Sequence, residues 1–590
     1  MNRRQIAGCV ALAMICSTRL TMGAGSDVAD AVMKGDAPAV RRLLAAKADV
    51  NAAQIDGATA LHWAVYRNEV ETAQVLIGAG ADPMAANREG ITPLVMAALY
   101  GNPGMVEVLL KGGADPKQRG PNGETTVMYA ARNGNPDVIK LLVAAGADVN
   151  AKEGLRATTA LMWAAQQGHE SAVKALIELG ADVSAKSGPA GLPRNYIAGK
   201  VGVASVKAAI RIREAAKAAG RTYEEQVAFE EANGASLRGR DAGGDDQPTR
   251  AQAAQAADAA ADQDVVIAGL VGGGSGGLTA LVFAAREGDI ESATALLEAG
   301  ADVNQTTEYG WTPLLVASNN RNYKLGAMLL ERGANPNIAN KGGWTPLYLA
   351  TDNRNIEGGD YPVPKPDMDH LDYIKLLLAR GADPNAQVRE NTLSRTIFTQ
   401  QWFFEPGATA FVRAAQSSDV ELLKLLLAYG ADPKIPTGNG DTALTASGGI
   451  GWVDGVTYER SPKDNVEAVR LLLDLGLDPN HANNEGRTAL MGAAGKGRND
   501  VVQLLVERGA NLEARDLGSR DTDRLNGSDI SGHTWQALDY AEGLVRFGVQ
   551  SAIARPETAA LIRKMLAERG LRVPPPGRDV LSICVVDICR

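Results

Sequence analysis

Residues 92–117 read TPLVMAALYGNPGMVEVLLKGGADPK and contain two short helices together with the signals that begin and end them. Thr92 suits the N-cap of the first helix, and Pro93 suits its first turn. The apolar run at 106–110 indicates a second helix, which Gly113 ends in the left-handed conformation common there. Neither helix is long enough to bury its apolar face alone, so this unit needs neighbours.

The same unit recurs along the chain, with 33 residues from Thr59 to Thr92 and again from Gly80 to Gly113. The Thr-x-Leu step begins at Thr59, Thr92, Thr159, Thr279, Thr312, Thr345, Thr442 and Thr488, with variants at Thr125 and Thr409. The Gly-Ala-Asp step or a close variant begins at Gly80, Gly113, Gly146, Gly180, Gly300, Gly333, Gly381, Gly430, Gly476 and Gly509. A fixed period of this length indicates stacked units rather than independent domains.

These two steps resemble ankyrin repeats, whose core reads T-P-L-H followed later by G-A-D-x-N. The resemblance covers about 80% of the chain and implies an all-α solenoid of about twelve helix–turn–helix repeats with hairpin fingers and a concave groove. The chain departs from the pattern because only His62 keeps the histidine, and alanine often replaces the proline. We therefore expect the family's Thr–His hydrogen bonding to be weakened in most repeats.

The period defines the predicted domain organisation. We expect an N-terminal block of repeats at 26–186 and a C-terminal block with loop insertions at 278–573. Between them, 187–277 has no repeat motif and reads as an insertion near the middle of the chain, partly helical and partly disordered. Residues 574–590 form a C-terminal tail.

Residues 1–25 have the three-part layout of a bacterial secretory signal peptide. Arg3 and Arg4 precede an apolar run of 11 residues at 6–16, and small residues follow at 22–25. This layout predicts removal of the segment and a periplasmic or secreted protein. The residues after the paired arginines fit a twin-arginine signal poorly, and the choice between the Sec and twin-arginine routes stays open.

Cleavage of that segment would leave Cys584 and Cys589 as the remaining cysteines. An oxidising compartment permits a disulfide between them. Residues five apart in an extended strand are separated by roughly 16 Å, whereas a disulfide needs Cα atoms within about 7 Å. The bond therefore requires the chain to turn back between the two cysteines, and the pairing stays open.

Composition argues against two classes of partner. The chain carries 60 basic and 69 acidic side chains, a net charge of −9, whereas a general nucleic-acid binder needs a basic face. No apolar run reaches the roughly 18 residues of a membrane span. We therefore expect neither nucleic-acid binding nor a transmembrane segment.

The sequence contains no strong catalytic motif: no G-x-S-x-G, H-E-x-x-H or Walker loop occurs. Asp367, Asp369, His370 and Asp372 cluster as possible metal ligands, but Asp369 is more simply a helix N-cap. We predict that the protein is not an enzyme and needs no cofactor or metal. The alternative is a metal-binding or enzymatic protein whose chemistry lies in the insertions.

Two sets of positions are candidate contacts for a partner. The first lies at the ends of the first helices, where Tyr66, Arg67, Leu99 and Tyr100 should line the groove and be exposed. One turn earlier, an aromatic or large apolar residue recurs at a position that resembles the family's buried leucine. We predict that these side chains pack in the core: Trp63, Met96, Tyr129, Trp163 and Phe283.

The second set lies on three consecutive fingers that carry aromatic residues, although only 5% of the chain is aromatic: Tyr309, Trp311, Trp344, Trp402 and Phe403. Aromatic anchors dominate interface energetics, so we predict that these fingers contact a partner. The alternative is that the two tryptophans Trp311 and Trp344 stack on neighbouring fingers of the same chain.

Together these features predict a monomeric, non-catalytic scaffold that binds another protein through its groove and finger tips. A purely structural, envelope-associated spacer is the second alternative.

Overall fold

The computed structural model describes residues 26–188, 276–355, 365–390, 405–452, 457–517, 534–545 and 553–576, together with positions 215, 219, 221, 226 and 229. The predicted signal peptide, most of the insertion at 187–277, and Cys584 and Cys589 lie outside these residues. The chain divides into two compact units, Met1–Ser187 with Thr294–Gly300, and Gly188–Ala293 with Ala301–Arg590. We call them the N-terminal unit and the C-terminal unit.

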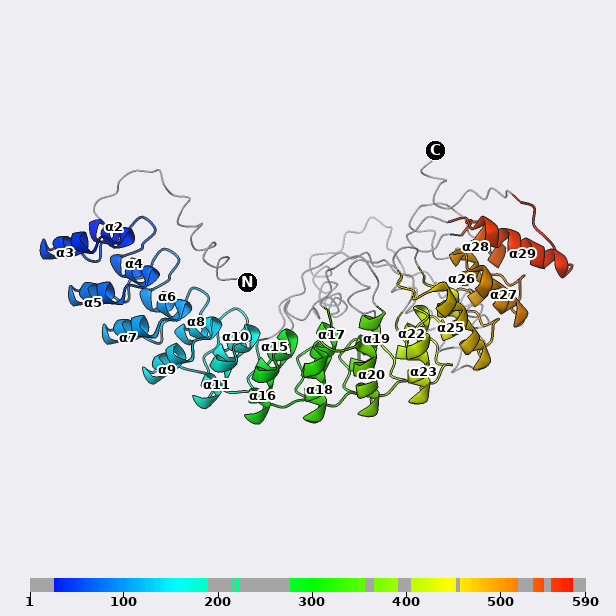
Figure 1. Ribbon diagram of the computed structural model, residues 1–590, viewed down its shortest axis with the longest axis horizontal. Coiled ribbons are helices and arrows are strands. Elements are labelled where there is room, and N and C mark those ends of the chain that lie inside the picture. Colours follow the sequence, from blue (N-terminus) through cyan, green and yellow to red (C-terminus); the bar gives the residue numbers. More distant parts are fainter. Residues whose placement is uncertain are drawn as a thin grey trace. The chain divides into compact units, whose positions relative to one another are not determined.

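The N-terminal unit consists of paired helices (Figure 1). They are α2 (Asp27–Lys34), α3 (Ala37–Ala45), α4 (Ala60–Arg67), α5 (Val70–Gly78), α6 (Pro93–Tyr100), α7 (Pro103–Lys111), α8 (Thr126–Asn133), α9 (Pro136–Ala144), α10 (Ala160–Gln166) and α11 (Glu170–Glu178). In each pair the first helix packs on its second helix and on the first helix of the next pair.

The C-terminal unit has the same plan, and its repeats begin with α15 (Ala280–Glu287). The next helix, α16 (Ile290–Glu298), lies across the boundary between the units. The other helices of the C-terminal unit are α17 (Pro313–Asn320), α18 (Tyr323–Glu331), α19 (Pro346–Arg354), α20 (His370–Ala379), α22 (Ala410–Gln416), α23 (Val420–Ala428), α24 (Ala443–Gly448), α25 (Pro462–Asp474), α26 (Ala489–Lys496), α27 (Asn499–Glu507), α28 (Ala537–Ala541) and α29 (Pro556–Glu568).

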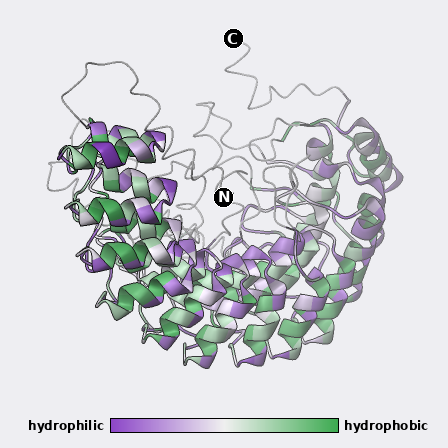
Figure 2. Cartoon of the chain, turned by 60° about the vertical axis from the view of Figure 1, so that its left-hand side comes forward, coloured by the Kyte–Doolittle hydropathy of each residue, from purple (hydrophilic) through white to green (hydrophobic). Residues whose placement is uncertain are grey.

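The described residues thus form 24 helices, and their only strand-like pairs are two isolated bridges, Arg119 with Thr125 and Ala482 with Thr488. The predicted all-α repeat solenoid is confirmed. Hydrophobic residues lie within the helices of both units, and hydrophilic residues concentrate at helix ends and in loops (Figure 2). Among the described helices, none is long and apolar enough to cross a membrane.

The threonines begin the first helices as predicted. Thr312, for example, accepts the backbone N–H of Leu315 at 3.1 Å. At Thr59 the hydroxyl instead lies 2.9 Å from Nδ1 of His62, whose Nε2 is 3.0 Å from the carbonyl oxygen of Ile91 in the next finger. Burial lowers the pKa of His62, which keeps its ring neutral. This bonding joins two repeats at the one position where the sequence keeps the histidine.

Asparagine side chains join successive repeats at the end of the Gly-Ala-Asp step. The Asn385 amide donates to the carbonyl oxygen of Gly430 at 3.0 Å and accepts the N–H of Asp432 at 2.7 Å. Both backbone groups follow the second helix of the next repeat, so one side chain satisfies a helix-end carbonyl and an adjacent amide. The same pair of bonds occurs at Asn51, Asn150, Asn304, Asn337 and Asn480.

Replacing Asn385 by alanine is expected to lower the free energy of unfolding by about 1 kcal/mol, because two exposed but well-aligned hydrogen bonds are lost. Urea denaturation of the full chain measures the change, and hydrogen exchange at the Asp432 amide measures its local part. Lys434→Ala is the matched control, because an exposed lysine occupies the asparagine position there. Equal effects of the two substitutions would show that the asparagine bonds contribute nothing.

Candidate functional site

The candidate groove residues of the N-terminal unit lie at matching positions, seven and eight residues after the capping threonine. The exposed fraction of the side chain is 45% for Tyr66 and 40% for Tyr100. Arg67 is also exposed, and Leu99 is half-buried. The predicted exposure of this set is therefore confirmed for Tyr66, Arg67 and Tyr100.

Three further aromatic side chains share this surface, although the sequence predicted them to be core residues. Trp63, Tyr129 and Trp163 are half-buried, so that prediction is wrong for them. It is right for Met96 and Phe283, which are buried. We call Trp63, Tyr66, Tyr100, Tyr129 and Trp163 the aromatic surface.

The rings of the aromatic surface contact one another edge to face. Ring centroids are 5.6 Å apart for Trp63 and Tyr66, 6.3 Å for Tyr66 and Tyr100, and 6.1 Å for Tyr129 and Trp163. Such contacts favour particular ring orientations. Rings that are already oriented lose less side-chain entropy when a partner binds.

Finger residues hold the two indoles in place. The Trp63 N–H donates to the Gln54 side chain at 2.7 Å, and the Trp163 N–H donates to the Thr158 hydroxyl at 2.8 Å. Burial and the nearby Glu124 carboxylate raise the pKa of Tyr129 to about 12. The Tyr129 hydroxyl thus keeps its proton and hydrogen-bonds the Glu124 side chain.

Several of the equivalent positions of the C-terminal unit carry buried polar side chains. Asp352 and Gln416 are buried and lie seven residues after the capping threonines of their helices. Arg413 is also buried and lies four residues after the capping threonine of α22. The Arg413 guanidinium pairs with Asp352 at 2.7 Å. At Lys496, eight residues after its threonine, burial lowers the pKa to about 8 while Glu459 pairs with the ammonium group. These side chains are used within the fold and offer no comparable exposed surface.

The aromatic fingers differ from the prediction. Tyr309 is buried, and the exposed fractions of the Trp311 and Trp344 side chains are 1% and 0%. The two indoles pack edge to face with centroids 5.7 Å apart, and the Trp344 N–H donates to the carbonyl oxygen of Glu390 at 3.0 Å. The predicted exposure of these anchors is wrong, because adjacent fingers cover one another's rings.

The Tyr309 hydroxyl also donates to the Glu390 carboxylate, at 3.1 Å. The contact between the two indoles confirms the alternative prediction, that Trp311 and Trp344 stack on neighbouring fingers of the same chain. Trp402 and Phe403, the other two residues of the predicted finger contact, lie outside the described residues.

The possible metal ligands of the sequence serve the fold. Asp369 accepts the N–H of Leu371 at 2.8 Å and caps α20, which confirms its interpretation as an N-cap. His370 Nδ1 lies 2.9 Å from the Tyr323 hydroxyl, and Asp367 accepts the backbone N–H of Lys324. Within the described ranges, no three His, Cys, Asp or Glu side chains gather in a way that could hold a metal ion.

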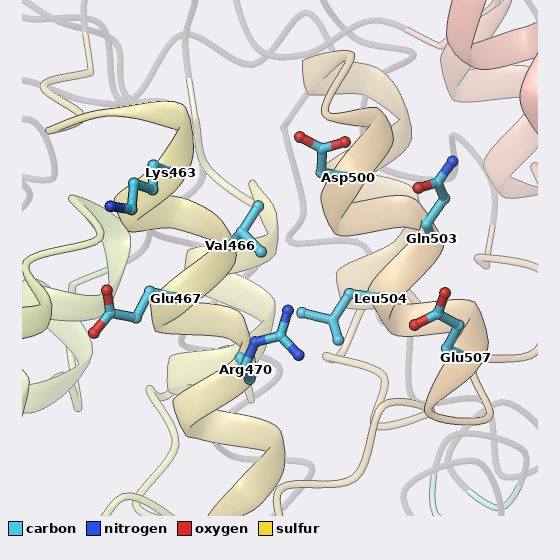
Figure 3. A pocket seen from close by; sticks show the side chains of 8 residues that line it. All are labelled: Lys463, Val466, Glu467, Arg470, Asp500, Gln503, Leu504 and Glu507. Atoms are coloured by element: carbon cyan, nitrogen blue, oxygen red, sulfur yellow. The ribbon is translucent and has the colours of Figure 1, made fainter.

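An open hollow of about 640 Å³ lies between α25 and α27 (Figure 3). Val466 and Leu504 form its apolar part, and charged side chains of both helices surround them. No sequence pattern pointed to it, because the hollow depends on how two second helices lie side by side.

Comparison with known proteins agrees with this geometry. The family model for ankyrin repeats (three copies) matches residues 28–120, 112–187, 256–340, 281–388 and 460–516, which together cover more than half of the chain. No curated protein matches it. Since the repeat period, the capping threonines and the stacked helix pairs all agree with that model, the chain belongs to the ankyrin-repeat family.

Proposed function

We propose that the protein is a non-catalytic scaffold that binds another protein through the aromatic surface of its N-terminal unit. The observation that carries this proposal is the set of exposed and half-buried rings on four successive first helices, α4, α6, α8 and α10. Ankyrin repeats are generally protein–protein interaction modules. Buried polar residues at the same positions of the C-terminal unit favour the N-terminal unit as the contact.

The chemistry of the surface suits protein recognition. Tyrosine, tryptophan and arginine are the residues most often found as energetic hot spots in interfaces. Tyr66 and Tyr100 present large exposed rings, and burial raises the pKa of the Tyr100 hydroxyl. Arg67 lies next to them and pairs with Glu69 at 2.6 Å, an exposed ion pair that a partner carboxylate could replace.

Site-specific crosslinking tests the proposal. A photoreactive phenylalanine analogue at position 99, next to Tyr100 and at the repeat position that Tyr66 occupies, is expected to capture a partner in the native compartment. Replacing both Tyr66 and Tyr100 by alanine in the same chain should weaken that capture by about 30-fold or more, since hot-spot truncations cost about 2 kcal/mol or more.

Tyr429→Ala is the matched control, because Tyr429 is 39% exposed but follows a second helix of the C-terminal unit. Capture that persists unchanged in the Tyr66→Ala, Tyr100→Ala double variant would contradict the proposed contact. Capture that fails equally in the Tyr429 control would point to a general loss of folding, which circular dichroism detects.

We further propose that residues 1–25 direct the protein out of the cytoplasm, so that the partner is a periplasmic or secreted protein. The support is the basic, apolar and small-residue layout of that segment. The mass of the protein recovered from its native compartment tests this, because cleavage near residue 25 removes both Cys9 and Cys16. An intact N-terminus on cytoplasmic protein would contradict the proposal.

A further inference from the structure

Helices α25 and α27, which border the hollow, are 13 and 9 residues long. In Figure 3, Lys463 on α25 lies at the level of Asp500 on α27, and Arg470 lies at the level of Glu507. Figure 3 shows these two levels side by side across the hollow. The α25 wall thus carries two cations beside Glu467, which pairs with Lys424, and the α27 wall carries two anions.

These four charges are available for a contact. In the part of the chain that the structure describes, none of the four side chains has an ion-pair or hydrogen-bond partner. The neighbouring charges do pair: Lys424 with Glu467 at 2.7 Å on one side of α25, and Arg508 with Asp474 at 2.7 Å beyond the hollow. The hollow separates the two walls, so opposite charges at equal levels stay apart.

The geometry points to a homodimer in which a second copy of this chain docks on α25 and α27, with a twofold axis running along the hollow. That axis places α25 of each subunit over α27 of the other at the same level. Lys463 then faces Asp500 of the partner subunit, and Arg470 faces Glu507 of the partner subunit. Because a twofold contact is made twice, two pairs per subunit become four across the interface.

A second copy fits this surface because the surface is complementary to itself. A partner of another sequence would have to supply an anionic row and a cationic row at the same helical spacing. Val466, half-buried at the hollow, adds apolar contact at the centre of the interface. The inference is separate from the proposed binding surface, and it departs from the monomer expected from the sequence.

Sedimentation equilibrium of the full chain tests the dimer first. At about 20 mM salt we expect a reversible monomer–dimer equilibrium, and at about 500 mM salt a dissociation constant raised roughly 100-fold, because exposed charges are then screened within a few ångströms. A chain that stays monomeric at low salt and about 50 μM protein would overturn the proposal.

Charge reversal identifies the surface. The Lys463→Glu, Arg470→Glu variant has two anionic walls, and the Asp500→Lys, Glu507→Lys variant has two cationic walls. Each alone should be monomeric, with self-association weakened by about 100-fold or more. An equimolar mixture should form a one-to-one heterodimer, since each wall then meets its opposite.

Arg41→Glu with Arg88→Glu is the control, because it changes the net charge as the first variant does at exposed arginines elsewhere. That control is expected to dimerise like the unmodified chain. Homodimers that persist in both reversal variants, or variants that do not associate when mixed although circular dichroism shows them folded, would overturn the assignment of this surface.

Discussion

Replacing Trp344 by alanine is expected to lower the free energy of unfolding by about 3–5 kcal/mol, the range for large aromatic residues truncated in a core. The side chain is fully buried, its ring packs against Trp311, and its N–H bonds the carbonyl oxygen of Glu390. Truncation therefore removes packing and leaves that carbonyl without its donor. Urea denaturation of the full chain, followed by circular dichroism, measures the loss.

Tyr66→Ala is the control, because it removes an exposed ring from the N-terminal unit and should cost less than about 1 kcal/mol. The two variants separate stability from binding. Trp344→Ala should unfold at lower urea, whereas Tyr66→Ala should lose partner capture. A Trp344→Ala chain of unchanged stability that no longer captured the partner would restore the exposed-anchor prediction.

The burial of Trp311 and Trp344 could have been predicted from their spacing in the sequence. Trp311 and Trp344 are 33 residues apart, the length of one repeat, so they occupy the same position on adjacent fingers. Equal positions on adjacent repeats contact each other in a stacked array. That spacing favours stacking, whereas the prediction of partner anchors relied on aromatic composition alone.

Most of the fold could be predicted because it depends on local signals. The capping threonines, the glycines after the helices and the apolar spacing each act within a few residues, and the repeat period then places the helix pairs. The exposure of Tyr66 and Tyr100 followed from the same register. The half-exposure of Trp63 did not, because its indole is held by Gln54, nine residues earlier in a finger whose path the repeat motif does not specify.

The buried ion pairs of the C-terminal unit could not be predicted from the sequence, for another reason. Their partners are far apart along the chain, as Arg413 and Asp352 are, or Arg354 and Asp419. A repeat pattern predicts that such positions share one surface. It does not predict which charges pair there or whether the surface is buried.

Replacing Arg413 by methionine is expected to cost about 3–5 kcal/mol, because it removes one partner of the buried ion pair with Asp352. The guanidinium also donates to the Ser417 hydroxyl at 3.0 Å and to the carbonyl oxygen of Asn355. Asp352→Asn should cost a similar amount, since it removes the other partner. Urea denaturation of both single variants and the double variant gives the coupling energy.

The double variant is expected to lose far less than the sum of the single losses, because both charges of the buried pair are then removed. Lys424 and Glu467 provide the matched pair: their charged atoms are also 2.7 Å apart, but both side chains are about half exposed. Water screens that pair, so Lys424→Met should cost less than about 1 kcal/mol. Equal, additive losses at the two pairs would mean that burial does not strengthen the Arg413–Asp352 interaction. A large coupling only at Arg413 would show that the C-terminal unit uses this first-helix position for its own stability.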